Sequence, residues 1–384
     1  MKILPRSVYI HIPFCEQICH YCDFNKFYIQ YQPVDEYLSA LEKEMESSFQ
    51  RYSNEHVENI FIGGGTPTAL TTKQVDRLMN IIHKMLDMRQ IKEFTVEANP
   101  DNLTNDKLSV LKNAQVNRLS IGVQTFHEDL LKKIGRTHTN EVVLTALRKA
   151  REFNFQNISI DLIYGLPGQS IEDFKETLEI ALSLDLQHYS TYSLIVEPKT
   201  VFYNLWRKGK LSLPPQDEEA KMYELLIEKM ELKGLSQYEI SNFAKKGFES
   251  KHNITYWDNE EYFGFGAGAH SYVNGVRRVN IGVLKKYIST INEHQFPYLS
   301  EHTVTKVEKM EEEMFLGLRK IKGVSKERFH EKFSLSLEDV FGKQIDEQKK
   351  KGLLAENGGY IYLTHKGKLL GNEVFQSFLQ VLDN

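Results

Sequence analysis

The chain has 384 residues, which is enough for one large domain and a smaller one. A hydrophobic content of 41% and a charged content of 26% are ordinary for a globular protein, and a net charge of -4 points to neither nucleic-acid nor anionic-membrane binding. The sequence has no secretory segment, no run of ~18 apolar residues, and three clustered cysteines that suit a reducing compartment. It therefore predicts a cytoplasmic protein without a transmembrane segment.

Strands and helices alternate through the first half of the sequence. Apolar segments predict six strands, at 7–14, 59–65, 93–98, 118–124, 158–164 and 187–196. Helical spacing fills the segments between them, at 34–52, 72–88, 105–113, 140–153 and 171–184. This alternation predicts an α/β fold with a parallel sheet and right-handed crossovers. The sheet is either open and doubly wound or a barrel, complete or incomplete.

The sequence changes character after residue 198. Residues 199–250 are more helical and more charged, with an amphipathic helix expected at 216–233. Residues 251–275 combine aromatic side chains with glycines, and we expect an ordered loop there rather than a helix.

The C-terminal part has the pattern of a separate small domain. Helices are expected at 306–319, 327–333 and 337–352, followed by a strand–turn–strand at 353–363. This order predicts a winged-helix-like domain. The lysines at 349–351 are more typical of a solvated face than of a nucleic-acid site, so we expect no nucleic-acid partner. The predicted domains are 1–198, 199–300 and 301–384.

All three cysteines lie in one stretch, as Cys15, Cys19 and Cys22, with the spacing C-x3-C-x2-C. Thiolates are soft ligands that select iron–sulfur clusters, zinc or Cu(I). Three of them can hold three irons of a [4Fe–4S] cluster and leave the fourth iron open to a small molecule. The alternative is zinc, with His11 or His20 as fourth ligand, although no second cysteine pair is present. A disulfide fits less well because the count is odd.

Polar residues fall late in three predicted strands, as Glu97, Gln124 and Asp161. The carboxyl ends of barrel strands form the active-site rim, and the cysteine loop also follows a strand. The second strand ends in Gly63-Gly64-Gly65-Thr66-Pro67. Glycines let a backbone approach a ligand closely and leave amides free to bind a carboxylate or phosphate. The run is neither a Walker A loop nor G-x-G-x-x-G.

The cysteine loop and the triple glycine together resemble the radical S-adenosylmethionine (SAM) superfamily. The resemblance implies an incomplete (β/α)6 TIM-like barrel in which the open iron takes the amino and carboxylate groups of SAM. The glycine strand would contact the amino group of the methionine part. Electron transfer from the reduced cluster would cleave SAM to a 5′-deoxyadenosyl radical, which the protein orients and protects.

Further motifs narrow the resemblance to the oxygen-independent coproporphyrinogen III oxidase group. They lie at 8–15 (VYIHIPFC), 63–67 (GGGTP), 97–100 (EANP), 122–125 (GVQT), 135–136 (GR) and 161–167 (DLIYGLP), and the C-terminal domain also resembles that group. By matching position, the resemblance implies SAM contacts from Tyr9, Tyr21, Gly64, Gly65, Thr66, Glu97, Gln124, Arg136 and Asp161. Their chemistry is suitable, since carboxylates can hold ribose hydroxyls and Arg136 can meet the SAM carboxylate.

Two departures from the oxidases bear on the subgroup. The oxidases carry a fourth cysteine two residues after the third, where this chain has Phe24, and Cys15 comes too early for their N-terminal extension. Both features resemble the haem chaperone branch, HemW, as does the H-N-x-x-Y-W motif that begins at His252. The resemblance implies haem binding, with His252 as an axial ligand and with Tyr256 and Trp257 as flat apolar contacts. A purely structural role of this histidine is the alternative.

The sequence thus predicts a haem chaperone that binds a [4Fe–4S] cluster, SAM and haem and transfers haem to an acceptor protein, for example a respiratory one. One rival is a radical SAM enzyme acting on a tetrapyrrole, such as a coproporphyrinogen III oxidase, an activity that Phe24 argues against. A second rival is a sensor of iron or redox state. An electron donor to the cluster is implied. Catalytic residues, SAM turnover and the choice between monomer and dimer are not determined by the sequence.

Overall fold

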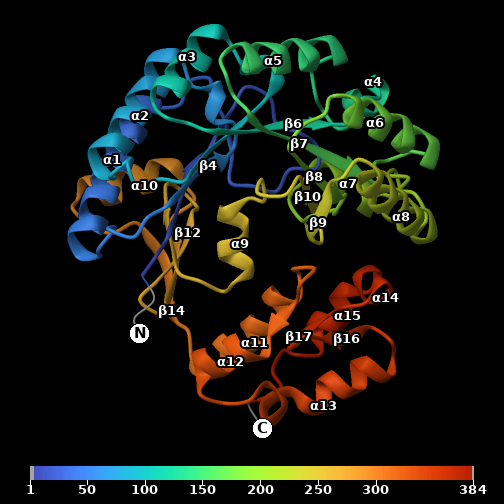
Figure 1. Cartoon of the computed structure of the whole chain (residues 1–384). Coiled ribbons are helices and arrows are strands. Elements are labelled where there is room, and N and C mark those ends of the chain that lie inside the picture. Colours follow the sequence, from blue (N-terminus) through green and yellow to red (C-terminus); the bar gives the residue numbers. More distant parts are fainter. Residues whose placement is uncertain (1–3, 383–384) are drawn as a thin grey trace.

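The computed structural model describes residues 4–382. Its dominant feature is a curved sheet with helices on the outside and a smaller C-terminal part packed below it (Figure 1). Within the described residues, no helix is long and apolar enough to cross a membrane. The ends of the two outer predicted domains, residues 1–3 and 383–384, lie outside the described part of the chain.

Six parallel strands form the centre of the sheet, in the order β1-β4-β5-β6-β7-β8. Their bounds are β1 (Ser7–Ile12), β4 (Asn59–Gly64), β5 (Glu93–Ala98), β6 (Arg118–Gln124), β7 (Asn157–Tyr164) and β8 (His188–Ser193). Every residue of β6 is buried, as expected for a sheet enclosed by helices on its outer face. The sheet ends at β14 (Tyr298–Thr303) and β9 (Ser236–Glu239) and does not close. The predicted α/β fold with an incomplete barrel is therefore confirmed.

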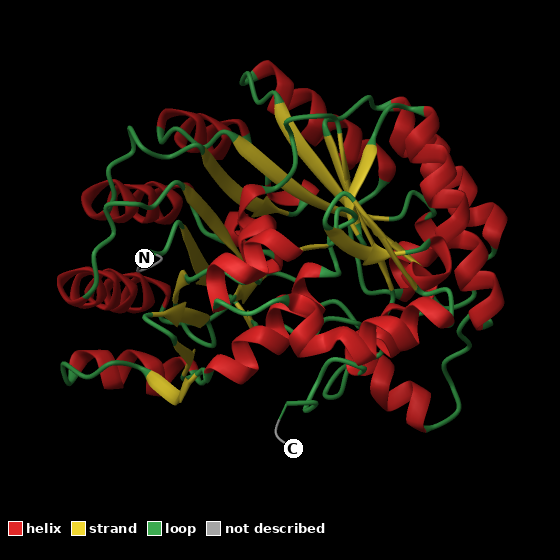
Figure 2. Ribbon diagram, turned by 60° about the horizontal axis from the view of Figure 1, so that its bottom comes forward, coloured by secondary structure: helices red, strands yellow, loops and turns green. Residues whose placement is uncertain are grey.

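The helices between these strands cover the outside of the sheet (Figure 2). They are α1 (Val34–Arg51), α2 (Thr72–Met85), α3 (Asn105–Asn113), α5 (Asn140–Glu152) and α6 (Ile171–Ser183), whereas the short α4 (Glu128–Lys133) belongs to a separate hydrophobic cluster. Capping explains where α2 and α6 begin, because Thr71 and Ser170 each form a capping box with the residue three positions later. The predicted helix at 72–88 ends early, at Met85, because Leu86 is extended and buried.

Additional strands extend both edges of the parallel sheet. β11 (Tyr262–Phe265) is parallel to β1, and β12 (His270–Val273), β13 (Val276–Asn280) and β14 follow antiparallel. On the other edge, β10 (Asn242–Ala244) and β9 are antiparallel to β8 and to each other. The helices α7 (Val201–Arg207), α8 (Gln216–Leu232) and α10 (Leu284–Asn292) accompany these segments.

The expectation of a loop at 251–275 is wrong. The segment forms the helix α9 (Lys251–Trp257), then β11 and β12. Its glycines allow close approach between segments of this chain, and this accounts for them without a flat ligand. A Cβ at Gly264 would collide with the carbonyl of His270, and one at Gly266, where φ is 101°, would lie 2.6 Å from the His11 carbonyl oxygen. The glycines therefore let β11 and the loop after it pack closely against β1 and β12.

The C-terminal part has its own hydrophobic cluster, which includes Met314, Phe329 and Phe341. The elements are α11 (Lys306–Gly317), β15 (Val324–Ser325), α12 (Lys326–Phe333), α13 (Leu337–Lys350), β16 (Leu354–Asn357), β17 (Tyr360–Leu363), α14 (His365–Leu369) and α15 (Gly371–Gln376). The three predicted helices and the hairpin are present, and β15 adds a third strand beside β17. Ion pairs from Asp258 to Lys320 and Arg328 join α9's end to this part.

Candidate functional site

The cysteine loop leaves β2 (Phe14–Cys15) and returns along β3 (Phe27–Tyr28), which pairs with β2 in parallel. Cys15 is buried, whereas Cys19 and Cys22 are partly exposed, and none forms a disulfide. The Thr66 hydroxyl donates to the Cys15 sulfur at 3.6 Å. Burial raises the pKa of Cys15 to about 11 and also raises the pKa of Cys22. These thiols therefore need a cationic partner, such as iron, to become thiolates near neutral pH.

Hydrophobic packing holds the loop against the barrel. Leu131, Ile134 and Phe202 form a small cluster from α4 and α7, with Tyr21 of the loop packed against it. The amide of His20 donates to the Ile134 carbonyl at 2.9 Å, so the middle of the loop is fixed by backbone as well as by side chains. This fixed frame allows three thiols to face one space.

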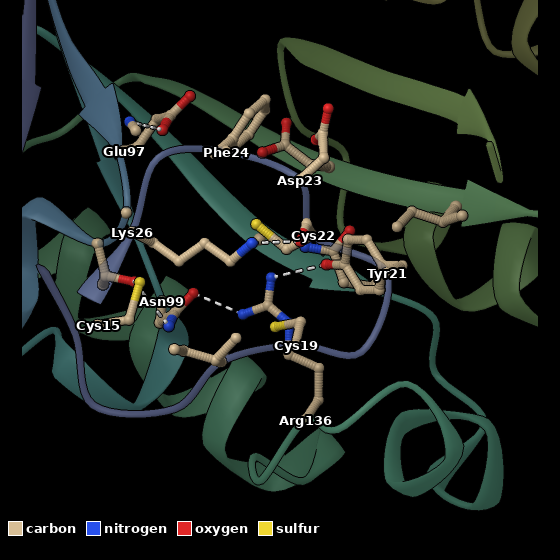
Figure 3. Close-up of a pocket in the computed structure, with 18 of the residues that line it drawn as sticks. Cys15, Cys19, Tyr21, Cys22, Asp23, Phe24, Lys26, Glu97, Asn99 and Arg136 are labelled. Atoms are coloured by element: carbon tan, nitrogen blue, oxygen red, sulfur yellow. Dashed lines mark hydrogen bonds between the residues drawn. The ribbon is translucent and has the colours of Figure 1, made fainter. Parts of the chain in front are cut away.

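That space is a cavity of about 430 Å³ at the carboxyl ends of the strands (Figure 3). It is lined by most of the residues that the resemblance assigns to the cluster and SAM. These are Cys15, Cys19, Cys22, Tyr21, Gly64, Gly65, Thr66, Glu97, Gln124, Arg136 and Asp161. Tyr9 is the exception, because it lines two neighbouring cavities instead. That these side chains contact SAM stays a prediction.

Arg136 reaches into the cavity between the cysteine loop and the end of β5. Its guanidinium donates to Asn99 Oδ1 at 2.6 Å and to the Tyr21 hydroxyl at 3.2 Å (Figure 3). The Nε atom is buried and has no partner among the described residues. A buried guanidinium with a donor to spare is suited to bind a carboxylate.

The carboxylates Glu97 and Asp161 line another wall of the same cavity. Burial, reinforced by the charge of Asp161, raises the pKa of Glu97 to about 7, and burial also raises the pKa of Asp161. Glu97 Oε2 accepts the amide of Gly64 at 3.0 Å, and Asp161 Oδ1 accepts the Ser120 hydroxyl at 3.1 Å. Their remaining acceptor positions fit ribose hydroxyls or an ammonium group.

Backbone strain occurs at the end of β6. Gln124 has a φ of 71° and follows a register shift between β6 and β7. A Cβ at Gly122 would lie 2.8 Å from the Gln124 amide nitrogen and 3.0 Å from the Arg136 guanidinium. The bulge lies at the turn of the backbone that carries Gln124, and the Gln124 and Arg136 side chains lie over Gly122, inside the cavity.

His252 lies in a second, inner cavity of about 210 Å³ that shares Phe24, Glu97 and Asp161 with the first. The ring is 1% exposed, stacks on Phe61 with centroids 4.9 Å apart, and its Nε2 lies 2.7 Å from the Tyr256 hydroxyl. Burial, together with the charge of Arg118, lowers the pKa of His252 to about 3. His252 is therefore a neutral, enclosed imidazole. Its role as an axial ligand stays a prediction.

The other two residues of the predicted haem motif lie in different surroundings. Tyr256 lines the inner cavity beside His252. Trp257 does not line it; the guanidinium of Arg319, from the C-terminal part, lies 5.1 Å from its ring centroid.

Several lining residues were not identified from the sequence, among them Asn99, Ser120 and Tyr192. Asn99 stands two residues after Glu97 in a motif that the resemblance includes, and its contact with Arg136 gives that motif a physical meaning. Tyr192 had no sequence signal of its own, although it lies late in the sixth strand, as Glu97 and Asp161 do in theirs.

The zinc alternative requires His11 or His20 as a fourth ligand beside the three cysteines. Among residues 4–382, no three His, Cys, Asp or Glu side chains lie together as the ligands of one metal ion would, the three cysteines included, so this arrangement alone does not separate zinc from an iron–sulfur cluster. Both nitrogens of His11 are occupied, since Nδ1 lies 2.9 Å from the Tyr9 hydroxyl and Nε2 lies 2.7 Å from the Asn25 carbonyl oxygen. The Nδ1 atom of His20 lies 2.8 Å from the carbonyl oxygen of Lys133.

Comparison with known proteins agrees with this architecture. Residues 9–181 match the radical SAM superfamily, and residues 304–370 match the HemN C-terminal domain. "Heme chaperone HemW" of Bacillus subtilis (strain 168) is 58% identical over 375 residues, covering 97% of this chain and 99% of that protein. The chain belongs to the HemW family. The HemW of Escherichia coli (strain K12) is 33% identical, with 99% of each chain covered.

A solved structure supports the same fold. The structure described as "Coproporphyrinogen III oxidase (HemN) from Escherichia coli is a Radical SAM enzyme" superposes with a TM-score of 0.86 and 26% identity. The match covers 99% of this chain and 91% of that one. This chain and that oxidase therefore share the barrel and the C-terminal part, and the fold alone does not separate a chaperone from an oxidase.

Proposed function

We propose that this HemW-family chain is a haem chaperone that holds one [4Fe–4S] cluster and SAM in the cysteine-lined cavity, binds haem, and delivers it to an acceptor protein. The observation that carries the cofactor part is the shared cavity, where three unpaired thiols face Arg136, Glu97 and the glycine strand. The names of the full-length relatives supply the haem part.

The donor set fits the two cofactors. Cys15, Cys19 and Cys22 would ligate three irons, and no fourth cysteine exists in the chain to close the cluster. Arg136 would hold the carboxylate of SAM through its free Nε position. Glu97 and Asp161 would hold hydroxyl or amino groups. When bound and reduced, the cluster supplies the electron for radical chemistry on SAM.

Phe24 favours a carrier over an oxidase. The oxidases that this chain resembles have a cysteine two residues past the third cluster ligand, and here an aromatic ring stands in that place. Phe24 is 60% exposed and lines the cysteine cavity as well as two neighbours. Figure 3 shows its ring on the side of the loop away from Cys15 and Arg136. An exposed ring in this place suits contact with a flat apolar ligand.

The proposed partners are haem, a haem acceptor and an electron donor to the cluster, and we propose a cytoplasmic location. The test is transfer of haem from this protein to a haem-free respiratory protein, followed by the acceptor's absorbance and activity. Transfer should occur with the parent and fall with Cys19→Ala, which cannot assemble the cluster. Failure of the parent to transfer haem to any of several acceptors would contradict the proposal.

The rival function is oxidative decarboxylation of coproporphyrinogen III, which the structural match to the oxidase favours. Anaerobic incubation with coproporphyrinogen III, SAM and a reductant tests it directly. We expect no protoporphyrinogen to form. Its formation at a catalytic rate would contradict the chaperone proposal and support the oxidase function.

A further inference from the structure

A third cavity, of about 370 Å³, borders the cluster space and shares Asp23 and Phe24 of the cysteine loop with it. Four aromatic side chains form much of its lining: Tyr9, Phe24, Tyr256 and Tyr262. Burial raises the pKa of Tyr256 and of Tyr262, so both phenols stay neutral and offer apolar surface rather than a phenolate ligand. We call this cavity the aromatic groove. Its lining also includes two histidines, His11 and His270.

The three imidazoles in or behind the groove differ in what they can bind. Both nitrogens of His11 are engaged, and its ring is 5% exposed. His252 has its Nε2 on the Tyr256 hydroxyl; its Nδ1 has no partner among the described residues but is buried, and the residue does not line the groove. His270 is an exposed residue, and within the described chain its ring makes no hydrogen bond. Only His270 therefore presents a free nitrogen to the groove.

The backbone under His270 is held firmly. The residue begins β12 and pairs with Val279 of β13, while its carbonyl lies against Gly264 of β11 so closely that no Cβ would fit there. The Asn25 side chain of the cysteine loop donates to the Ala267 carbonyl at 2.8 Å, just before this strand. The imidazole thus stands on a backbone fixed by these contacts, and Phe24 lines the same groove.

The protonation state of His270 suits a ligand. Partial burial, aided by the positive charge of Arg277, lowers the pKa of His270 below its usual value. A neutral imidazole has a lone pair free for iron, and histidine is a common axial ligand of haem. Arg277 itself is paired with Glu312 at 2.7 Å.

We propose that haem bound in the aromatic groove takes His270 as an axial ligand and rests against Phe24 and Tyr256. This inference depends on the proposed haem-binding function and names the site within it. His252 is then a positioning residue, because it acts through the Tyr256 hydroxyl rather than on the iron. The arrangement leaves Phe24 and His270 at the surface, where an acceptor can reach the haem.

The experiment is a titration of ferric haem into the full-length protein with its cluster reconstituted, read by the Soret band and by electron paramagnetic resonance of the haem. The variants are His270→Ala, His252→Ala and Tyr256→Phe, with His56→Ala as a control at an exposed histidine. Circular dichroism confirms that each variant is folded. Added imidazole tests whether the site left by His270→Ala can be refilled.

His270→Ala should lose the histidine-ligated spectrum and bind haem at least about ten-fold more weakly, and imidazole should restore the spectrum. His252→Ala and Tyr256→Phe should weaken binding and keep the parent's spectrum, and His56→Ala should match the parent. A parent-like spectrum for His270→Ala, or loss of ligation in His252→Ala alone, overturns the assignment while haem binding stands. If the parent binds no haem, the proposed function fails as well.

Discussion

Gly64 is a residue where the structure predicts a large effect of adding one methyl group. It ends β4 with a φ of 109°, and a Cβ there would collide with the His11 ring, which is held by bonds at both nitrogens. The positive φ costs an L-residue about 1–2 kcal/mol, and overpacking costs about 1–3 kcal/mol. Gly64→Ala should therefore lower the free energy of unfolding by about 2–5 kcal/mol.

The matched control is Gly209→Ala, at a glycine with a φ of 63° and no atom within 4 Å of the added Cβ. This variant has the cost of a positive φ but no steric collision, so its free energy of unfolding should fall by only about 1–2 kcal/mol. Urea unfolding followed by circular dichroism measures both values. If Gly64→Ala is no less stable than Gly209→Ala, the steric argument for a glycine at the end of β4 is refuted.

Three further outcomes follow from polar contacts. Arg136→Lys keeps the charge but loses the forked donor, so SAM should bind about ten-fold more weakly by calorimetry with the reconstituted protein. Burial raises the pKa of Glu44 from 4.5 to about 7, so the folded state binds that proton more tightly than the unfolded chain does. The free energy of unfolding of the parent should therefore fall by about 3 kcal/mol as the pH rises through this range. The stability deficit of Glu44→Gln relative to the parent should accordingly shrink by up to that amount from pH 4.5 to 7. Asp258→Asn removes two ion pairs to the C-terminal part and should lower the unfolding free energy by about 2 kcal/mol in urea.

Each of these variants has a control at an exposed residue of the same type: Arg207→Lys, Glu36→Gln and Asp346→Asn. Unchanged SAM affinity in Arg136→Lys would separate Arg136 from the SAM carboxylate. A pH-independent deficit in Glu44→Gln would mean that Glu44 titrates normally in the folded protein. Equal stabilities of Asp258→Asn and its control would show that the ion pairs of Asp258 do not stabilise the junction between α9 and the C-terminal part.

The sequence predicted the barrel well because its strands and helices carry local signals. The predicted bounds of β5, β6 and α3 match those of the structure. The polar ends of β5, β6 and β7 meet in one cavity because parallel strands end on the same side. Those residues could be grouped without any knowledge of tertiary contacts.

The surroundings of His252 could not be predicted in the same way. Its burial depends on Phe61 from β4 and Tyr9 from β1, nearly 200 and more than 200 residues away in the sequence. The edge strands β11 and β12 were missed for a related reason. The glycines at 264, 266 and 268 are typical of a loop, and only the close approach of the His270 carbonyl explains why Gly264 stands in a strand.

The cysteine loop contributes residues to both binding spaces. Cys15, Cys19 and Cys22 line the cavity that fits a cluster and SAM, Asp23 and Phe24 line both that cavity and the aromatic groove, and Asn25 lines the groove. Asn25 is fixed by the carbonyls of Ala267 and Gly282, so both ends of the short segment after the last thiol are tethered once iron is bound. Ligation of the three thiols would therefore also order the wall against which haem is proposed to lie. Under the proposed function, this coupling would give the cluster a structural task in haem delivery that does not depend on SAM cleavage.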